Sequence, residues 1–62
     1  MKAIYDNLIN GNLSDAKQQA ASYNVSRIAA QFQDFGMSAI RAAKAARYLK
    51  DMGTYQEYAD AK

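Results

Sequence analysis

The sequence contains no cysteine and no histidine, and this absence removes most of the side chains that carry enzymatic chemistry. The chain can form no disulfide framework. It can build no zinc site, Ser-His-Asp triad or Cys-His pair from its own residues. No glycine-rich phosphate loop or calcium loop is present. A hydrolase with two carboxylates would need a cleft, for which 62 residues leave little room. We therefore expect a protein that is not an enzyme, with no catalytic residues, no cofactor and no metal site.

Proline and tryptophan are also absent, and glycine occurs only at positions 11, 36 and 53, where helices would end. Alanine is abundant and β-branched residues are few, which favours helix over strand. The sequence predicts an all-α fold: one domain over residues 1–62, a small bundle of four to five short helices. So short a chain buries a limited core, so a homodimer or an obligate partner is as well supported as a monomer.

Long apolar segments are missing as well. No run approaches the roughly 20 residues that span a bilayer, so no membrane association is expected. The first residues lack the apolar region of a signal peptide. The expected location is the cytoplasm.

The strongest helix signal covers residues 38–52. Ser38 is a natural N-cap, and Gly53 is a natural C′ residue because glycine adopts the left-handed conformation freely. One side of this helix forms an apolar stripe with core-facing spacing. The stripe consists of Ala42, Ala45, Ala46, Leu49 and Met52. Because it is mostly alanine, a neighbouring helix can approach closely.

Four further helices are expected over residues 2–9, 13–23, 26–35 and 55–61. Residues 23–25 contain neither glycine nor proline, so the second and third helices are either continuous with a kink or separated by a turn. We favour the turn, with Asn24 or Ser26 starting the third helix. The most hydrophobic stripe is predicted in that helix, and Thr54 with Glu57 matches the capping box of the last one. The predicted stripes of the first three helices are Ile4, Tyr5, Leu8 and Ile9; Leu13, Ala16, Ala20 and Tyr23; and Val25, Ile28, Phe32 and Phe35.

The net charge of +2 conceals a local concentration of positive charge. Residues 1–40 carry three cations and three acids, residues 41–50 carry four cations and no acid, and residues 51–62 carry one cation and three acids. The simpler interpretation of these four cations is a solvated helix face. The alternative is a contact surface for phosphate or for an acidic partner. Nearby tyrosines would then belong to this surface, whereas in the simpler interpretation they only cover the core. The predicted partner-binding residues are Arg41, Lys44, Arg47, Tyr48, Lys50, Tyr55 and Tyr58.

Two stretches resemble the turn of a helix-turn-helix motif. Residues 20–26 resemble the A-x-x-x-G-V-S pattern, with Asn24 in place of the glycine. Residues 35–38 contain the glycine of the pattern, but the bulky Phe32 stands at the position of its small alanine. In the second alignment the basic helix 38–52 would be the recognition helix. The low net charge argues against a protein that neutralises several phosphates. A DNA-binding regulator is therefore the alternative hypothesis, and binding to protein is favoured over binding to nucleic acid.

The pattern LINGNLSDAK…ARYLK…G-x-Y-Q-E-Y, in a short helical chain without cysteine or histidine, resembles the small orphan proteins encoded by phages and prophages. The resemblance implies a protein that binds a host or viral macromolecule, such as an inhibitor of host defence, and the expected location of a phage-encoded protein would be the host cytoplasm. Many inhibitors of that kind are acidic mimics of DNA, and this chain departs from them in being neutral to basic. No functional residue is transferred by this resemblance.

Overall fold

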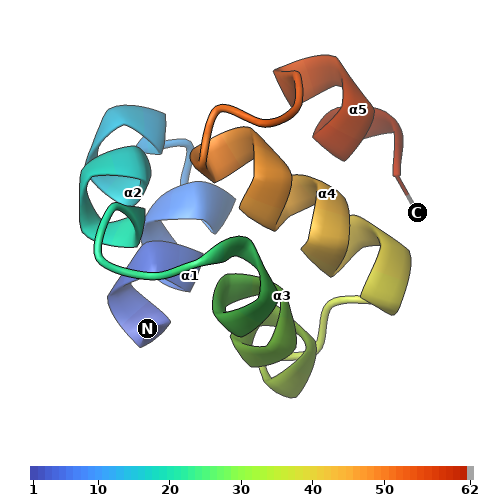
Figure 1. Cartoon of the computed structure of the whole chain (residues 1–62), viewed down its shortest axis with the longest axis horizontal. Coiled ribbons are helices and arrows are strands. Elements are labelled where there is room, and N and C mark those ends of the chain that lie inside the picture. Colours follow the sequence, from blue (N-terminus) through green and yellow to red (C-terminus); the bar gives the residue numbers. More distant parts are fainter. Residues whose placement is uncertain (62) are drawn as a thin grey trace.

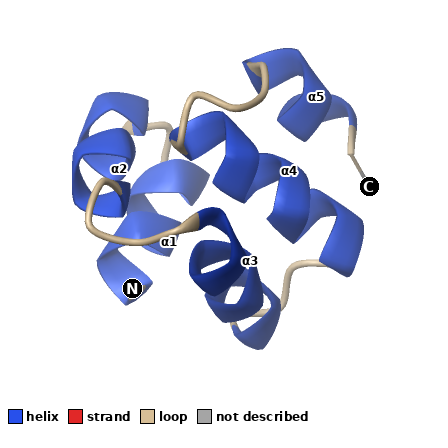
Figure 2. Cartoon of the chain, viewed as in Figure 1, coloured by secondary structure: helices blue, strands red, loops and turns tan. Residues whose placement is uncertain are grey.

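Five α-helices joined by short turns make up the computed structural model, which describes residues 1–61 (Figure 1). Figure 2 shows helices and loops and no strand over this range. The all-α class predicted from the sequence is therefore confirmed. No helix in residues 1–61 combines the length and the apolar character needed to cross a membrane. The helices are α1 (Lys2–Ile9), α2 (Leu13–Ala20), α3 (Val25–Asp34), α4 (Ala39–Leu49) and α5 (Tyr55–Asp60).

The last three helices begin at side-chain caps that the sequence predicts. Asn24 Oδ1 accepts the backbone N–H of Arg27 at 2.8 Å, which settles that Asn24 starts α3 and that a turn separates it from α2. Ser38 Oγ accepts the N–H of Arg41 at 3.2 Å. Thr54 opens α5 with both bonds of the capping box. Each bond satisfies a backbone donor that the first helical turn leaves free.

The ends of α3 and α4 share one backbone arrangement, the Schellman motif. After α3, Gly36 takes a φ of +110°, and the N–H of Met37 donates to the carbonyl of Phe32 at 3.0 Å. After α4, Asp51 takes the left-handed position with a φ of +59°, and the N–H of Met52 donates to the carbonyl of Arg47 at 2.8 Å. The prediction that Gly53 ends this helix was therefore wrong, because the motif closes two residues earlier.

Helix α4 lies at the centre of the packing. It packs against α3, α5 and α2, while α1 packs against α2 (Figure 1). The predicted alanine stripe forms its buried face, and the stripe of α3 faces it with Ile28 and Phe32 completely buried. The buried core consists of Ile4, Leu8, Ala16, Ala20, Ile28, Phe32, Ala42, Ala45, Ala46, Leu49, Tyr58 and Ala61.

Two residues predicted to face the core lie on the surface instead. Met52 is 61% exposed, because α4 ends at Leu49 and the reversal at Asp51 turns the chain away from the stripe. Ile9, the last residue of α1, is 51% exposed. Helix α2 is also shorter than predicted and ends at Ala20 rather than Tyr23.

The first of the two helix-turn-helix alignments does not have the packing of that motif. Helix α2 has its main contacts with α1 and α4 rather than with α3. The helices of the second alignment, α3 and α4, pack directly against each other across the turn at Gly36. Only the second alignment therefore remains as the basis of the DNA-binding alternative.

The two glycines nearest α4 provide a test of where the helices end. A Cβ at Gly36 would meet no atom within 4 Å, but the φ of +110° is strained for any other residue. Gly36→Ala should therefore lower the free energy of unfolding by about 1–3 kcal/mol. In Gly53→Ala the new Cβ would make only ordinary contacts, the nearest at 3.5 Å to Cβ of Arg47. Its stability should stay within about 0.5 kcal/mol of wild type.

Thermal unfolding followed by circular dichroism measures both variants. In a domain of this size a loss of 1 kcal/mol lowers Tm by roughly 4–8 °C. A larger loss in Gly53→Ala than in Gly36→Ala would contradict the assignment of these helix ends.

Candidate functional site

The outward face of α4 carries an apolar side chain in line with two cations. Ile40, Lys44 and Arg47 follow the i, i+4, i+7 spacing that places side chains along one face of a helix. They extend over about 10 Å of helix axis. Ile40 is 62% exposed, which is the largest exposed fraction among the large apolar residues. We call these three residues the α4 strip.

The cations of the α4 strip have few interactions within the chain. Among residues 1–61, no hydrogen bond, ion pair or cation–π contact involves the side chain of Lys44. Arg47 donates one long hydrogen bond of 3.4 Å to the carbonyl of Met52. No carboxylate of the described chain pairs with either cation. The strip therefore presents positive charge that the fold does not neutralise.

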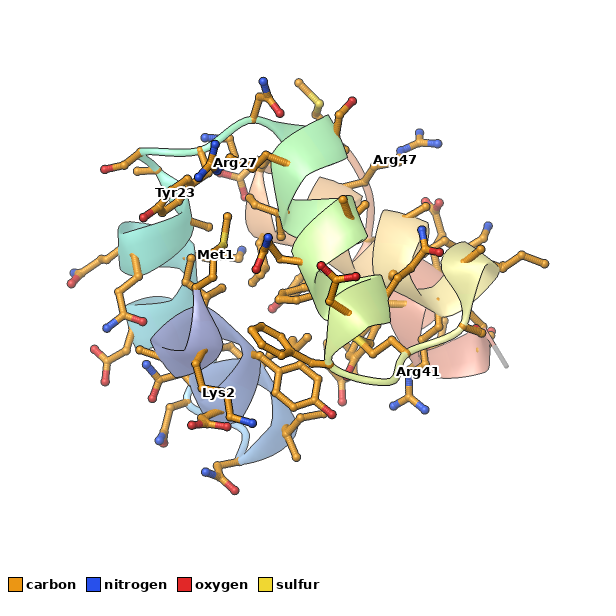
Figure 3. All side chains as sticks on the ribbon, turned by 90° about the horizontal axis from the view of Figure 1, so that it is seen from below. Met1, Lys2, Tyr23, Arg27, Arg41 and Arg47 are labelled. Carbon is orange, nitrogen blue, oxygen red and sulfur yellow. The ribbon has the colours of Figure 1, made fainter. Side chains whose placement is uncertain are left out.

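Arg41 borders the strip and rests on an aromatic ring. Its guanidinium lies 5.2 Å from the ring centroid of Tyr58 and donates to the hydroxyl of that residue at 3.4 Å. Figure 3 shows Arg41 and Arg47 directed away from the body of the protein, and Arg27 folded over Tyr23 in another part of the surface. Arg41 is thus both exposed and held in place, which lowers the entropy lost when it contacts a partner.

Three tyrosines join α4 to α5. Tyr48 and Tyr58 are stacked with an interplanar angle of 8° and centroids 6.4 Å apart, and the ring of Tyr55 meets both edge-on. Tyr58 is only 6% exposed, whereas Tyr55 is 51% exposed. Of the predicted contact tyrosines, Tyr55 alone offers a large free surface. Tyr58 is part of the core and supports Arg41 from beneath.

Lys50 has a structural position although it was predicted to contact a partner. Its Nζ donates to the carbonyls of Ala20 and Ala21, both at 3.2 Å, at the C-terminal end of α2. A cation there satisfies carbonyls that the helix leaves free and interacts favourably with the helix dipole. Lys50 therefore joins α4 to α2.

Lys17 of α2 is a second cation with internal contacts. Its Nζ lies 3.3 Å from a carboxylate oxygen of Asp51 and 4.6 Å from the ring centroid of Tyr48. This ion pair involves the residue that adopts the left-handed conformation after α4. Because Asp51 is occupied in this way, it does not neutralise the α4 strip.

Of the predicted contact residues, Arg41, Lys44 and Arg47 lie along the outer side of α4, and Tyr48 packs against Tyr55 beside them. Tyr58 is buried beneath Arg41, and Lys50 is directed to the end of α2. Sequence reasoning missed Ile40, whose exposed position at the head of the strip is visible from the same helical spacing that located the cations. The described residues include no cluster of three or more histidine, cysteine, aspartate or glutamate side chains arranged to hold a metal ion.

Comparisons of the chain with protein-family models, with curated proteins and with solved structures find no match.

Lys50 and Lys44 allow the structural and the free cation to be compared on one helix. Lys50→Met keeps the apolar stem but removes both hydrogen bonds to the end of α2, so it should lower the free energy of unfolding by about 1 kcal/mol. Lys44→Met keeps the partly buried apolar stem and removes no hydrogen bond, ion pair or cation–π contact within the described chain, so it should change the free energy of unfolding by less than about 0.5 kcal/mol. Chemical denaturation of both variants provides the measurement. Equal stability of the two would show that the bonds from Lys50 contribute nothing.

Proposed function

We propose that this protein is a non-enzymatic binding module that uses the α4 strip and Arg41 to dock on an acidic surface of a macromolecular partner. The proposal rests on one observation: the exposed Ile40 is aligned with Lys44 and Arg47, and neither cation forms an ion pair with an acid of the described chain. An apolar side chain bordered by charged groups is the usual arrangement of a protein-binding site, with a dry centre and a polar rim.

The positions of the other cations favour a protein partner over DNA. Lys17 and Lys50 are engaged within the fold, and Arg27 rests on Tyr23 away from α4. Three cations therefore remain around the strip, which neutralise few phosphates, whereas DNA affinity depends strongly on how many are neutralised. The resemblance to small phage proteins supports a host macromolecule as the partner and inhibition of a host-defence system as the outcome.

A DNA-binding regulator is the alternative, and one specific observation favours it. Helices α3 and α4 pack directly across the turn at Gly36, and the first turn of α4 exposes Arg41. In a helix-turn-helix unit this turn would enter the major groove. The two hypotheses differ in salt response, because phosphate contacts release counterions while a packed apolar contact does not.

Charge reversal on the strip tests the proposal. Lys44→Glu combined with Arg47→Glu should abolish binding while the helix content stays unchanged, since neither residue belongs to the buried core. The matched control is Lys2→Glu combined with Arg27→Glu, which changes the net charge from +2 to −2 in the same way but at other parts of the surface. The control should bind as wild type does.

The assay is affinity capture from nuclease-treated bacterial lysate, with bound proteins identified by mass spectrometry. A protein captured by wild type and by the control, but not by the strip variant, is the expected result. A gel-shift titration with random-sequence duplex DNA runs in parallel. If DNA binds, weakens steeply with salt and is released by the strip variant, while nuclease removes all captured material, the DNA-binding alternative replaces the proposal.

A further inference from the structure

A hollow opens between the end of α1 and the turn that leads into α4. Its volume is about 300 Å³. Ile9 contributes an apolar side chain that is 51% exposed. The lining residues are Tyr5, Ile9, Gly36, Met37, Ser38 and Arg41. Because Gly36 has no side chain, and nothing lies within 4 Å of the place where one would begin, the hollow stays open at the turn.

The dimensions and lining of the hollow suit one bulky side chain. Pockets for small-molecule ligands begin at about 300 Å³ and are usually deeper and more enclosed. Tyr5, Ile9 and Met37 supply an apolar wall on which a hydrophobic group would bury surface. Methionine adapts its shape to what it contacts, which favours a partner side chain over a rigid ligand.

The charge at the hollow is positive. Arg41 is the one charged residue in its lining, and it also borders the α4 strip. Lys44 and Arg47 follow one and two turns further along α4, at about 4.5 and 9 Å of helix rise from Arg41. A partner segment that enters the hollow with an apolar side chain would therefore meet cations in succession along α4.

We propose that the hollow receives one bulky apolar side chain of an acidic helical segment, whose carboxylates lie along Arg41, Lys44 and Arg47. This inference rests on the proposed function and identifies the class of segment recognised. Charge complementarity selects an acidic segment, and the apolar side chain in the hollow fixes its register along α4. The recognition follows the pattern of an amphipathic helix anchored by its apolar residues.

Two synthetic peptides test the inference. Each is a glutamate-rich sequence of about 15–20 residues, long enough to populate a helix, and the two differ only in one tryptophan replaced by alanine. The protein contains no tryptophan, so emission from tryptophan reports on the peptide alone. Isothermal titration calorimetry measures the affinity of both peptides. The tryptophan peptide should bind about tenfold more tightly, as partial burial of one side chain implies, and its emission should shift to the blue.

Variants of α1 test whether the preference for the tryptophan peptide arises in the hollow. Ile9→Asn removes apolar lining without adding charge and should reduce the tenfold preference to roughly two- or threefold, while the alanine peptide binds as before. Ala3→Asn is the matched control, because Ala3 is an exposed residue of the same helix that lies outside this hollow. It should leave the preference intact.

The remaining outcomes separate the two proposals. If both peptides bind equally and both are released by Lys44→Glu with Arg47→Glu, the hollow has no role and the proposed function stands. If neither peptide binds, or if the charge reversal leaves binding unchanged, both the hollow and the proposed function are refuted. If Ile9→Asn and Ala3→Asn lower the preference equally, the tryptophan is bound elsewhere than in the hollow.

Discussion

Helix α4 contacts three other helices at once, and it can do so because the side chains on its buried face are small. Alanines at positions 42, 45 and 46 are completely buried, so the neighbouring axes can approach closely and the larger side chains of α3, Ile28 and Phe32, fill the space between them. A chain of 62 residues has no other large source of burial. The polar face of α4 then points outward by necessity, and it carries the positive charges of Arg41, Lys44 and Arg47.

The fold uses some of its cations to hold helices together and leaves others without an ion pair to any acid of residues 1–61. Lys50 binds the carbonyl end of α2, and Lys17 spans from α2 to Asp51 at the end of α4. These contacts join segments that lie more than 25 residues apart in the sequence. Lys44 and Arg47 have no comparable role, although they belong to the same helix as Lys50. The contacts of each cation therefore distinguish structural from functional roles better than the number of charges does, because only the unpaired cations are available to a partner.

Local signals predicted most of the fold, and long-range contacts account for what they missed. The five helices, the caps at Asn24, Ser38 and Thr54, and the alanine stripe all follow from residues within a few positions of one another. The position of Asp51 does not, because a non-glycine residue in the left-handed conformation is sparsely populated and here coincides with an ion pair from a distant helix. The same limit explains the candidate site. Helical spacing places Arg41, Lys44 and Arg47 near one another on α4, but it could not show that Lys50 reaches α2 or that Tyr58 is buried.

The exposed apolar residues are easiest to understand together with these unpaired cations. Single apolar side chains on a surface are ordinary. Here, however, Ile9 lines the hollow beside the turn that begins α4, and Ile40 lies in the first turn of α4 next to Arg41. In so small a domain, an apolar residue left in water gives up burial that the core needs. A partner that covers this region would supply that burial, and it would stabilise the folded state in proportion to its affinity. The arrangement is therefore consistent with a surface shaped by binding, since nothing in the internal packing of α4 requires an isoleucine at position 40.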